Sequence, residues 1–202
     1  MKNIIFGLLT IGFITGARAQ QIPLYHQYQV APLIFNPAFA GQDTTVNASM
    51  IHRTQWKGMV GAPQTSMLVL DGPITYKNMG IGGMIYNDAS DIFQRLAVYS
   101  MYSYRIKINE EMRAQLGLSL GFVNNRIDLT RVQVNDENDP FLNYNQSLRK
   151  YTVDGNFGGA FFLKGLKAGF AIPQLFGSKV TYLDAKTKTV YTLNRHLLVH
   201  AK

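Results

Sequence analysis

Two histidines near the carboxyl end of the chain have the spacing of a metal-binding pair on a helix. His196 and His200 lie four residues apart, and on a helix this spacing brings two imidazoles to one face, as a zinc site needs. The nearby residues Leu193, Leu197 and Val199 recur instead at even spacings, which is typical of a strand. On a strand, residues four apart lie roughly 13 Å from each other, too far to share one ion. We therefore expect no metal site here, and no cofactor.

An acidic stretch at 135–140 offers carboxylate and amide oxygens, which are the ligands that Ca²⁺ prefers. It lacks the glycine and the closing glutamate of an EF-hand loop. We interpret it as a surface loop and keep calcium binding as the alternative.

Nucleophilic catalysis has weak support in this sequence. The chain has no cysteine, which excludes disulfide bonds, cysteine nucleophiles and iron–sulfur clusters. Ser100, Ser103 and Ser119 lie within alternating strand patterns, so we expect no nucleophile elbow of the hydrolase type. A triad assembled from distant positions is the alternative, but we do not expect an enzyme.

The first 19 residues have the organisation of a secretory signal peptide. Lys2 gives a positive start, an apolar run covers 4–15, and Ala17 and Ala19 frame a cleavage site. We therefore expect a signal peptide at 1–19, export through the Sec pathway, and one mature domain at 20–202. An apolar amino-terminal strand or helix is the alternative.

The composition is that of a folded chain with few charges. Of the 202 residues, 47% are hydrophobic and 16% are charged, against roughly 25% charged in soluble domains. The net charge is +8, and removal of residues 1–19 leaves 18 basic and 12 acidic residues, a net charge of +6. The basic residues are scattered, which together with the export signal argues against a nucleic-acid partner. No stretch after residue 19 holds 18 consecutive apolar residues, so we expect no membrane-spanning helix.

Most of residues 20–202 alternate with the period of a β-strand. In 96–108 the even positions are mostly apolar or aromatic, and in 114–122 the odd positions are only Gly, Ser and Gln. A soluble sandwich turns a charged face to water. An outer-membrane barrel turns its apolar face to lipid and its small polar residues to the lumen, and this pattern is the closer match.

The predicted fold class is all-β: an outer-membrane antiparallel β-barrel with about eight strands in this chain. Strands are expected at 45–55, 65–70, 80–87, 96–108, 114–122, 153–163, 166–172 and from 193 onward. Turns are expected at 71–73, 109–111 and 164–165, and longer polar connections near 88–94, 130–150 and 174–190. The single tryptophan, Trp56, is typical of an anchor at a membrane interface, with a partner contact as the alternative.

A series of short motifs runs through the chain. The first, from Gln27 to Gly41, fits the pattern Q-Y-x-x-x-P-L-x-x-N-P-A-x-A-G. The others are R-T-Q-W-K-G at 53–58, G-A-P-Q-T at 61–65, G-I-G-G at 80–83, N-D at 87–88, Y-S-Y-R at 102–105, D-G-N-F-G at 154–158 and I-P-Q-L at 172–175. In this order they resemble the PorP/SprF proteins, which are membrane components of the type IX secretion system.

This resemblance implies a non-enzymatic outer-membrane β-barrel that helps to export or display secreted proteins, including adhesins in gliding bacteria. The implied partners are outer-membrane lipid, other type IX secretion components and a secreted substrate protein. The candidate family-motif or partner contacts are Asn36, Pro37, Gly41, Arg53 and Trp56. For the residues of 36–41 the alternative is a structural role in turns.

The chain ends shortly after its last expected strand begins, without a terminal aromatic residue. We therefore expect a barrel that is incomplete at its carboxyl end, a truncated part of a larger one. Two other functions stay open at this point: a general porin or small-solute channel, and a secreted soluble β-sandwich adhesin.

Overall fold

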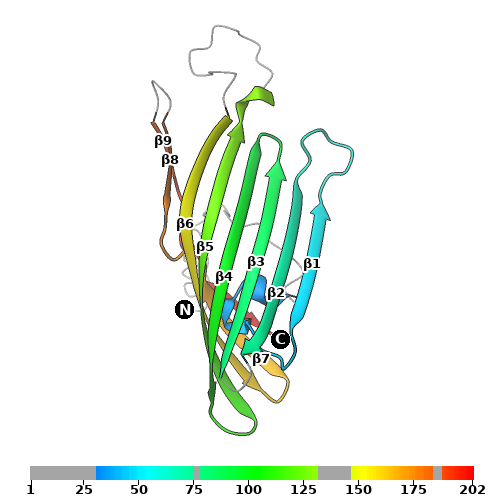
Figure 1. Ribbon diagram of the computed structural model, residues 1–202, viewed down its shortest axis with the longest axis vertical. Coiled ribbons are helices and arrows are strands. Elements are labelled where there is room, and N and C mark those ends of the chain that lie inside the picture. Colours follow the sequence, from blue (N-terminus) through cyan, green and yellow to red (C-terminus); the bar gives the residue numbers. More distant parts are fainter. Residues whose placement is uncertain (1–30, 75–77, 132–146, 184–187) are drawn as a thin grey trace, which may run out of the picture.

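The structure, a computed structural model, describes residues 31–74, 78–131, 147–183 and 188–202. Within these residues the elements are strands and short 3-10 turns (Figure 1). In chain order they are η2 (Pro32–Ile34), η3 (Pro37–Phe39), β1 (Asn47–Thr54), β2 (Gln64–Ile74), β3 (Met79–Ser90), β4 (Phe93–Lys107), β5 (Met112–Asp128), η4 (Leu129–Arg131), β6 (Ser147–Leu163), β7 (Leu166–Ile172), β8 (Lys179–Leu183), β9 (Lys188–Thr192) and β10 (Leu198–Ala201). No helix in the described part of the chain is long and apolar enough to cross a membrane.

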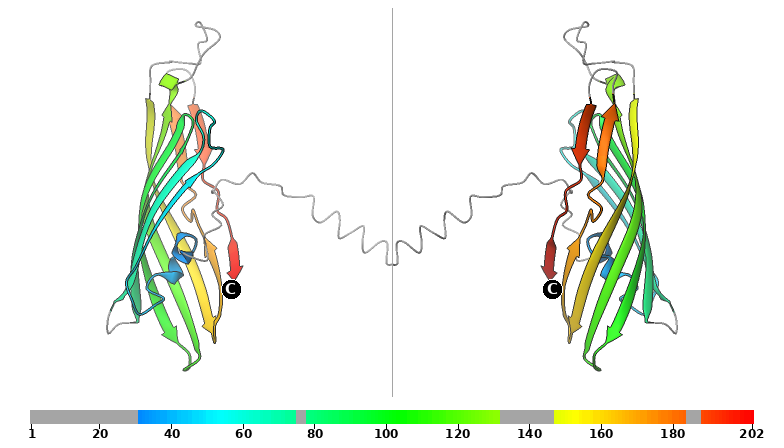
Figure 2. Two further views of the ribbon diagram at one scale, coloured as in Figure 1. Left: turned by 90° about the vertical axis from the view of Figure 1, so that its right-hand side faces the viewer. Right: turned by 90° about the vertical axis from the view of Figure 1, so that its left-hand side faces the viewer.

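Eight of these strands form one antiparallel sheet in the order β1-β2-β3-β4-β5-β6-β7-β10. The sheet curls into a half-barrel, with η2 and η3 on its concave side (Figure 2). Its two edges are β1 and β10, and β8 pairs with β9 in a separate hairpin. The predicted all-β antiparallel barrel fold with about eight strands is confirmed by this sheet.

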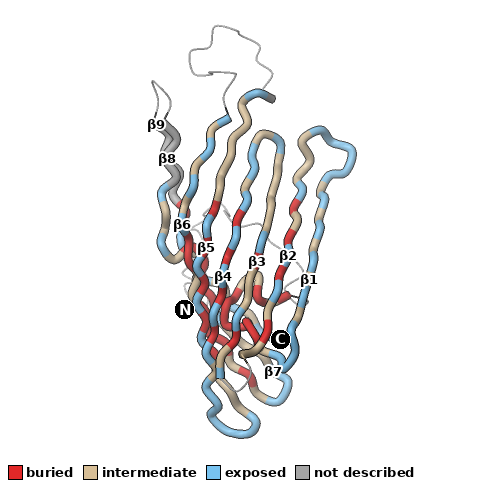
Figure 3. Tube along the Cα trace, viewed as in Figure 1, coloured by how far each residue is buried: buried red, intermediate tan, exposed pale blue. Residues whose placement is uncertain are grey.

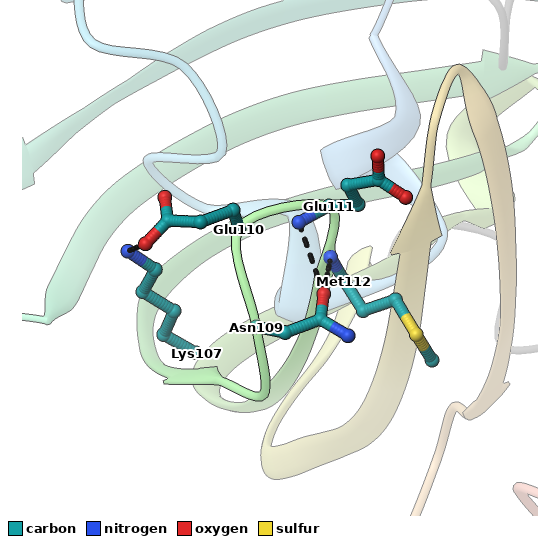
Figure 4. Close-up of polar contacts among 5 residues, drawn as sticks. All are labelled: Lys107, Asn109, Glu110, Glu111 and Met112. Atoms are coloured by element: carbon teal, nitrogen blue, oxygen red, sulfur yellow. Dashed lines mark hydrogen bonds and ion pairs between the residues drawn. The ribbon is translucent and has the colours of Figure 1, made fainter.

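The sheet has two ends with different connections. At one end, called the turn end here, short turns join β4 to β5 and β6 to β7, and the other end is called the loop end. In the β4–β5 turn, Asn109 Oδ1 accepts hydrogen bonds from the backbone N–H groups of Glu111 and Met112 at 3.0 and 2.7 Å (Figure 4). Lys107 Nζ and Glu110 Oε1 form an exposed ion pair at 2.6 Å across the same turn. The asparagine thus closes the turn that the sequence predicted at 109–111.

The two faces of the sheet carry different side chains. The convex face exposes a continuous set of large apolar side chains, which includes Leu68, Leu70, Ile81, Ile85, Leu96, Val98, Tyr102, Leu116, Leu118, Leu120, Phe122, Val153 and Phe170. Side chains on the concave face are mostly buried, and they include Ala97, Tyr99, Met101, Ser103, Gln115, Ser119 and Val123. Figure 3 shows buried positions interspersed with exposed ones along the central strands. The apolar face of the predicted alternation is therefore the exposed, convex face.

Strand β2 continues through the turn that the sequence predicted at 71–73. Asp71, Gly72 and Pro73 pair with residues of β3 as far as Ile74. Proline is tolerated there because β1 pairs only as far as Asp71, so the missing N–H of Pro73 falls where β2 has no β1 neighbour.

The predicted long connection near 88–94 is wrong. The ladder between β3 and β4 continues to the pair Ser90–Phe93, so only two residues make the turn. Asp91 adopts the left-handed conformation there, with φ of +51°, as tight hairpins require. Its backbone N–H donates to Gly61 O at 2.9 Å, which ties this turn to the β1–β2 loop.

The region expected as a loop at 174–190 contains strands. It holds β8, and the hairpin is completed by β9. The last strand of the large sheet begins at Leu198 rather than at 193. Strands β5 and β6 each have 17 residues. Both continue toward the loop end beyond the apolar alternation, through residues that are mostly polar, such as Asn125 and Lys150.

Candidate functional site

Residues 31–42 lie against the concave face of the sheet and are called the docked segment (Figure 2). Pro32 and Pro37 begin its two 3-10 turns, where a fixed φ and a missing N–H carry no penalty. Asn36 caps the second turn, since its Oδ1 accepts the N–H of Ala38 at 2.9 Å. The local sequence therefore specifies a compact double turn, and the sheet buries it.

Asn36 fastens the docked segment to two neighbouring strands. Its Nδ2 donates to Gly159 O of β6 at 3.1 Å and to Phe170 O of β7 at 3.0 Å. The residue is fully buried, and both ends of its side-chain amide are used. This side chain therefore acts as a bracket between the docked segment and the sheet.

Glycines in the sheet make room for the docked segment. Gly80, Gly117 and Gly158 lie on the concave face, and a Cβ atom on any of them would lie less than 3.0 Å from an atom of residues 36–40. Real Cβ contacts of that length essentially never occur. The small residues that sequence analysis placed in the lumen thus form the surface on which the segment rests.

Polar side chains of β4 and β5 bind the carboxyl half of the docked segment. Ala40 O accepts hydrogen bonds from Ser103 Oγ at 2.7 Å and from Gln115 Nε2 at 2.8 Å. Arg105 Nη2 donates to Gly41 O, and the Gly41 N–H donates to Asp71 Oδ2 at 2.8 Å. Ser103 and Arg105 are spaced by two along β4, so the alternation assigns both to the same, inner face.

Aromatic packing completes the contact. Phe39 is buried and meets Phe162 of β6 edge to face, with ring centroids 5.6 Å apart. It also lies 5.3 Å from the ring of His200 on β10. In the order of the sheet, the docked segment therefore contacts strands from β2 to β10.

A cavity of about 70 Å³ lies beside the docked segment, toward the loop end of the concave side of the sheet, which is called the trough here. Its lining includes the stacked rings of Tyr86 and Tyr99, and Tyr99 donates to Asp154 Oδ2 at 3.1 Å. The side-chain amide of Gln174 also lines it, is buried, and has no hydrogen-bond partner among the described protein groups. A polar cavity of this size accommodates a few water molecules, which would satisfy such an amide.

The structure divides the sequence-predicted site residues into two groups. Asn36, Pro37 and Gly41 are buried in the docked segment. Arg53 lies on β1 opposite Thr65, and Trp56 follows β1 at the loop end, with 67% of its surface exposed. Whether either group contacts a partner stays a prediction, but the first group has an observed role within the chain.

The histidines do not form a metal pair in the described part of the chain. His200 lies on β10 against Phe39, whereas His196 precedes the strand. No group of three or more potential metal ligands occurs among the described residues. The acidic stretch at 135–140 lies outside the described residues, and calcium binding by it stays an alternative.

One motif was overlooked in the sequence. Residues 117–121 read G-L-S-L-G, which matches the G-x-S-x-G sequence pattern of a hydrolase nucleophile elbow. They lie in the middle of β5, however, and Ser119 Oγ accepts the N–H of Asn156 at 3.2 Å. An elbow needs a sharp turn from strand to helix, whereas Ser119 lies within a continuous strand. The sequence motif is therefore present without the geometry of an elbow.

Ser103, Gln115, Asp154 and Gln174 are among the buried polar residues that sequence analysis did not select as site residues. For the three that lie on strands, the available signal was a polar side chain in register with Gly and Ser on the small-residue face. Gln174 follows β7 at a φ of +58°, a conformation that its sequence does not indicate.

The comparisons with known proteins bear on the whole chain. A family model described as type IX secretion system membrane protein PorP/SprF matches residues 17–201. The chain belongs to the PorP/SprF family. No curated protein and no solved structure was found to match it.

Membership makes this PorP/SprF chain a membrane component of the type IX secretion system, in a family that is not a family of enzymes. Parts of several of its motifs meet on the concave side of the sheet. Residues 36–41 belong to the docked segment, Gly80 and Gly158 support it, and Gln174 lines the neighbouring cavity. The motifs therefore mark an internal arrangement that this PorP/SprF chain builds from distant parts of its sequence.

Proposed function

We propose that this chain spans the outer membrane and assists the type IX machinery in exporting or displaying secreted proteins such as adhesins. The observation that carries the membrane part of the proposal is the exposed apolar convex face. Water-soluble proteins rarely expose a contiguous apolar patch of more than a few hundred Å². An apolar face that extends over most strands of the sheet is instead typical of contact with lipid.

The height of the apolar face supports this placement. On β4 the outward apolar residues extend from Leu96 to Ile106, about 33 Å along the strand at roughly 3.3 Å per residue. With a strand tilt of about 40°, this corresponds to about 25 Å along the membrane normal, the height of the apolar band in outer-membrane barrels. Toward the loop end, the next outward row consists of Gln94, Arg126 and Arg149, which suit the head-group region.

The open edges of the sheet bear on assembly. Backbone groups on unpaired edges cost several kcal/mol each in hydrocarbon. We therefore propose that the β1 and β10 edges are paired in the assembled membrane protein. We also propose that residues 1–19 are removed as a signal peptide and that 20–202 forms the mature domain.

The docked segment supports a secretion role over a general porin. Porins of the outer membrane keep a water-filled lumen, whereas here residues 31–42 fill part of the concave side with buried side chains. A segment held by hydrogen bonds from several strands obstructs free diffusion, and it suits a component that works by binding other proteins.

The test is deletion of the gene in the source bacterium and complementation with this chain. We expect type IX cargo to accumulate in the periplasm of the deletion strain and to return to the surface or medium on complementation. The control is an outer-membrane protein that does not use the system, whose level should not change. Unchanged export, together with ion conductance of the purified protein in planar bilayers, would instead establish a channel.

A further inference from the structure

Positively charged side chains gather on the concave side at the turn end. Lys107, Arg113, Phe162 and Lys167 are directly opposite one another on β4, β5, β6 and β7 and form one cross-strand row. The guanidinium carbon of Arg113 lies 4.3 Å from the centroid of the Phe162 ring, and Lys167 Nζ lies 5.9 Å from it. Within this row Lys107 and Arg113 are like charges directly opposite each other, an arrangement that destabilises a sheet. Glu110 pairs with Lys107, and an anion beside Arg113 would offset the repulsion further.

The hollow at this end has an excess of positive charge. It has a volume of about 540 Å³, and its charged lining comprises Arg105, Lys107, Glu110, Glu111, Arg113, Lys164 and Lys167. The two glutamates bind Lys107 and Lys164 at 2.6 and 2.7 Å (Figure 4 shows the first pair). Beyond these two pairs, the lining holds three further cations, Arg105, Arg113 and Lys167, and no further carboxylate. Exposed Asp43 nearby offsets part of this excess positive charge at Arg113.

The three inner cations donate to neutral groups. Arg105 Nη2 and Arg113 Nη2 donate to the backbone oxygens of Gly41 and Gln42, and Lys167 Nζ donates to Gln42 Oε1. A guanidinium has five N–H donors and an ammonium has three, so these contacts leave donors for an anion. The volume is also within the roughly 300–1,000 Å³ of ligand sites.

We propose that this hollow, lined by Arg105, Arg113 and Lys167, binds an acidic polypeptide segment through its carboxylates. Arginine pairs with carboxylates through two parallel hydrogen bonds, and arginine clusters are a known means of recognising acidic motifs. Anionic lipid is disfavoured as the occupant because these cations point into the trough. The neighbouring outward residues, Ile106 and Leu166, are apolar and exposed.

This inference deepens the proposed function, since the acidic segment would belong to a partner or cargo of the secretion system. The test uses the protein extracted from membranes of the source bacterium in a nonionic detergent. Binding of a fluorescent ten-residue oligoglutamate peptide is measured by anisotropy, with an oligoglutamine peptide of the same length as the control ligand. We expect only oligoglutamate to bind, and more weakly as NaCl rises, because salt screens such pairs.

The decisive variant is Arg113→Gln with Lys167→Gln, which should lower the affinity for oligoglutamate about tenfold. The control is Lys57→Gln with Arg149→Gln, which removes the same charge at the loop end and should change the affinity less than twofold. If the first variant fails to fold by circular dichroism, Lys107→Gln at an exposed position should still weaken binding about threefold.

Equal binding of the two peptides, or an equal loss in the loop-end control, would overturn the proposal. So would retention on phosphatidylglycerol vesicles that depends on Arg113 and Lys167 in a protein that does not bind oligoglutamate, since the site would then be one for lipid. The readout is independent of export. Peptide binding with unchanged export in the deletion strain would therefore refute the proposed function and leave the site in place.

Discussion

Removal of the Asn36 side chain should release the docked segment from the sheet. The substitution Asn36→Ala takes a partner from one backbone N–H and two backbone carbonyls, all in contact with a fully buried side chain. A buried polar group left unpaired costs about 1–3 kcal/mol, and partial relaxation reduces the sum. We therefore expect docking to weaken by about 2–4 kcal/mol, which is about a 30- to 700-fold shift in the docking equilibrium.

The assay uses the absence of cysteine from the chain. Leu33→Cys places one thiol in the docked segment at a position that is 3% exposed, and a smaller side chain fits where leucine was. The thiol reacts with a polar maleimide only when the segment leaves the sheet, so the labelling rate follows the undocked population. In isolated outer membranes, Asn36→Ala should raise this rate by the factor above.

The matched control is Asn78→Ala, which removes an exposed asparagine side chain before β3. It should leave the labelling rate of Leu33→Cys unchanged. If Asn36→Ala also leaves that rate unchanged, the hydrogen bonds of Asn36 do not hold the segment, and the bracket role assigned to it is incorrect.

Three further predictions concern packing and the membrane. Gly158→Ala should reduce the yield of folded protein in heat-modifiability gels, because its Cβ would collide with the Asn36 side chain, whereas Gly83→Ala should be tolerated because its nearest neighbour would be 3.8 Å away. Leu118→Arg on the convex face should destabilise the membrane-inserted protein by about 2–4 kcal/mol in urea titrations, and Asn124→Arg, in the same outward register nearer the loop end, should cost at most about 1 kcal/mol. Tyr99→Phe removes the hydrogen bond to Asp154 and should lower the stability by about 1 kcal/mol in the same titrations.

The fold could be predicted largely because alternation records which side of a strand meets an apolar environment. Positions such as Leu116, Leu118 and Leu120 alternate with Gly117 and Ser119, and this both located β5 and assigned its faces. The same signal ended at Phe122, where the outward side chains become polar, so the last part of β5 was not predicted. Strand pairing beyond the apolar band depends on backbone hydrogen bonds, which leave no pattern in side-chain hydrophobicity.

The candidate site was predictable only in part. The motif that contains Asn36 and Pro37 indicated a turn, and the structure contains one. That this turn lies inside the trough depends on contacts with residues more than a hundred positions away, such as Gly158 and Phe170. A single sequence carries no record of such proximity, so the alternation could assign these glycines only to the inner face of the strands.

The reach of Asn36 along the chain has a consequence for biogenesis. Its two strand partners lie 123 and 134 positions later, so the docked segment, which is synthesised early, cannot form these hydrogen bonds until β6 and β7 have paired. Until then its hydrophobic side chains, including Leu33 and Phe39, are available to chaperones. Complete docking therefore requires that the sheet is paired as far as β7. A protease that attacks the free segment would degrade chains whose folding stops before that point.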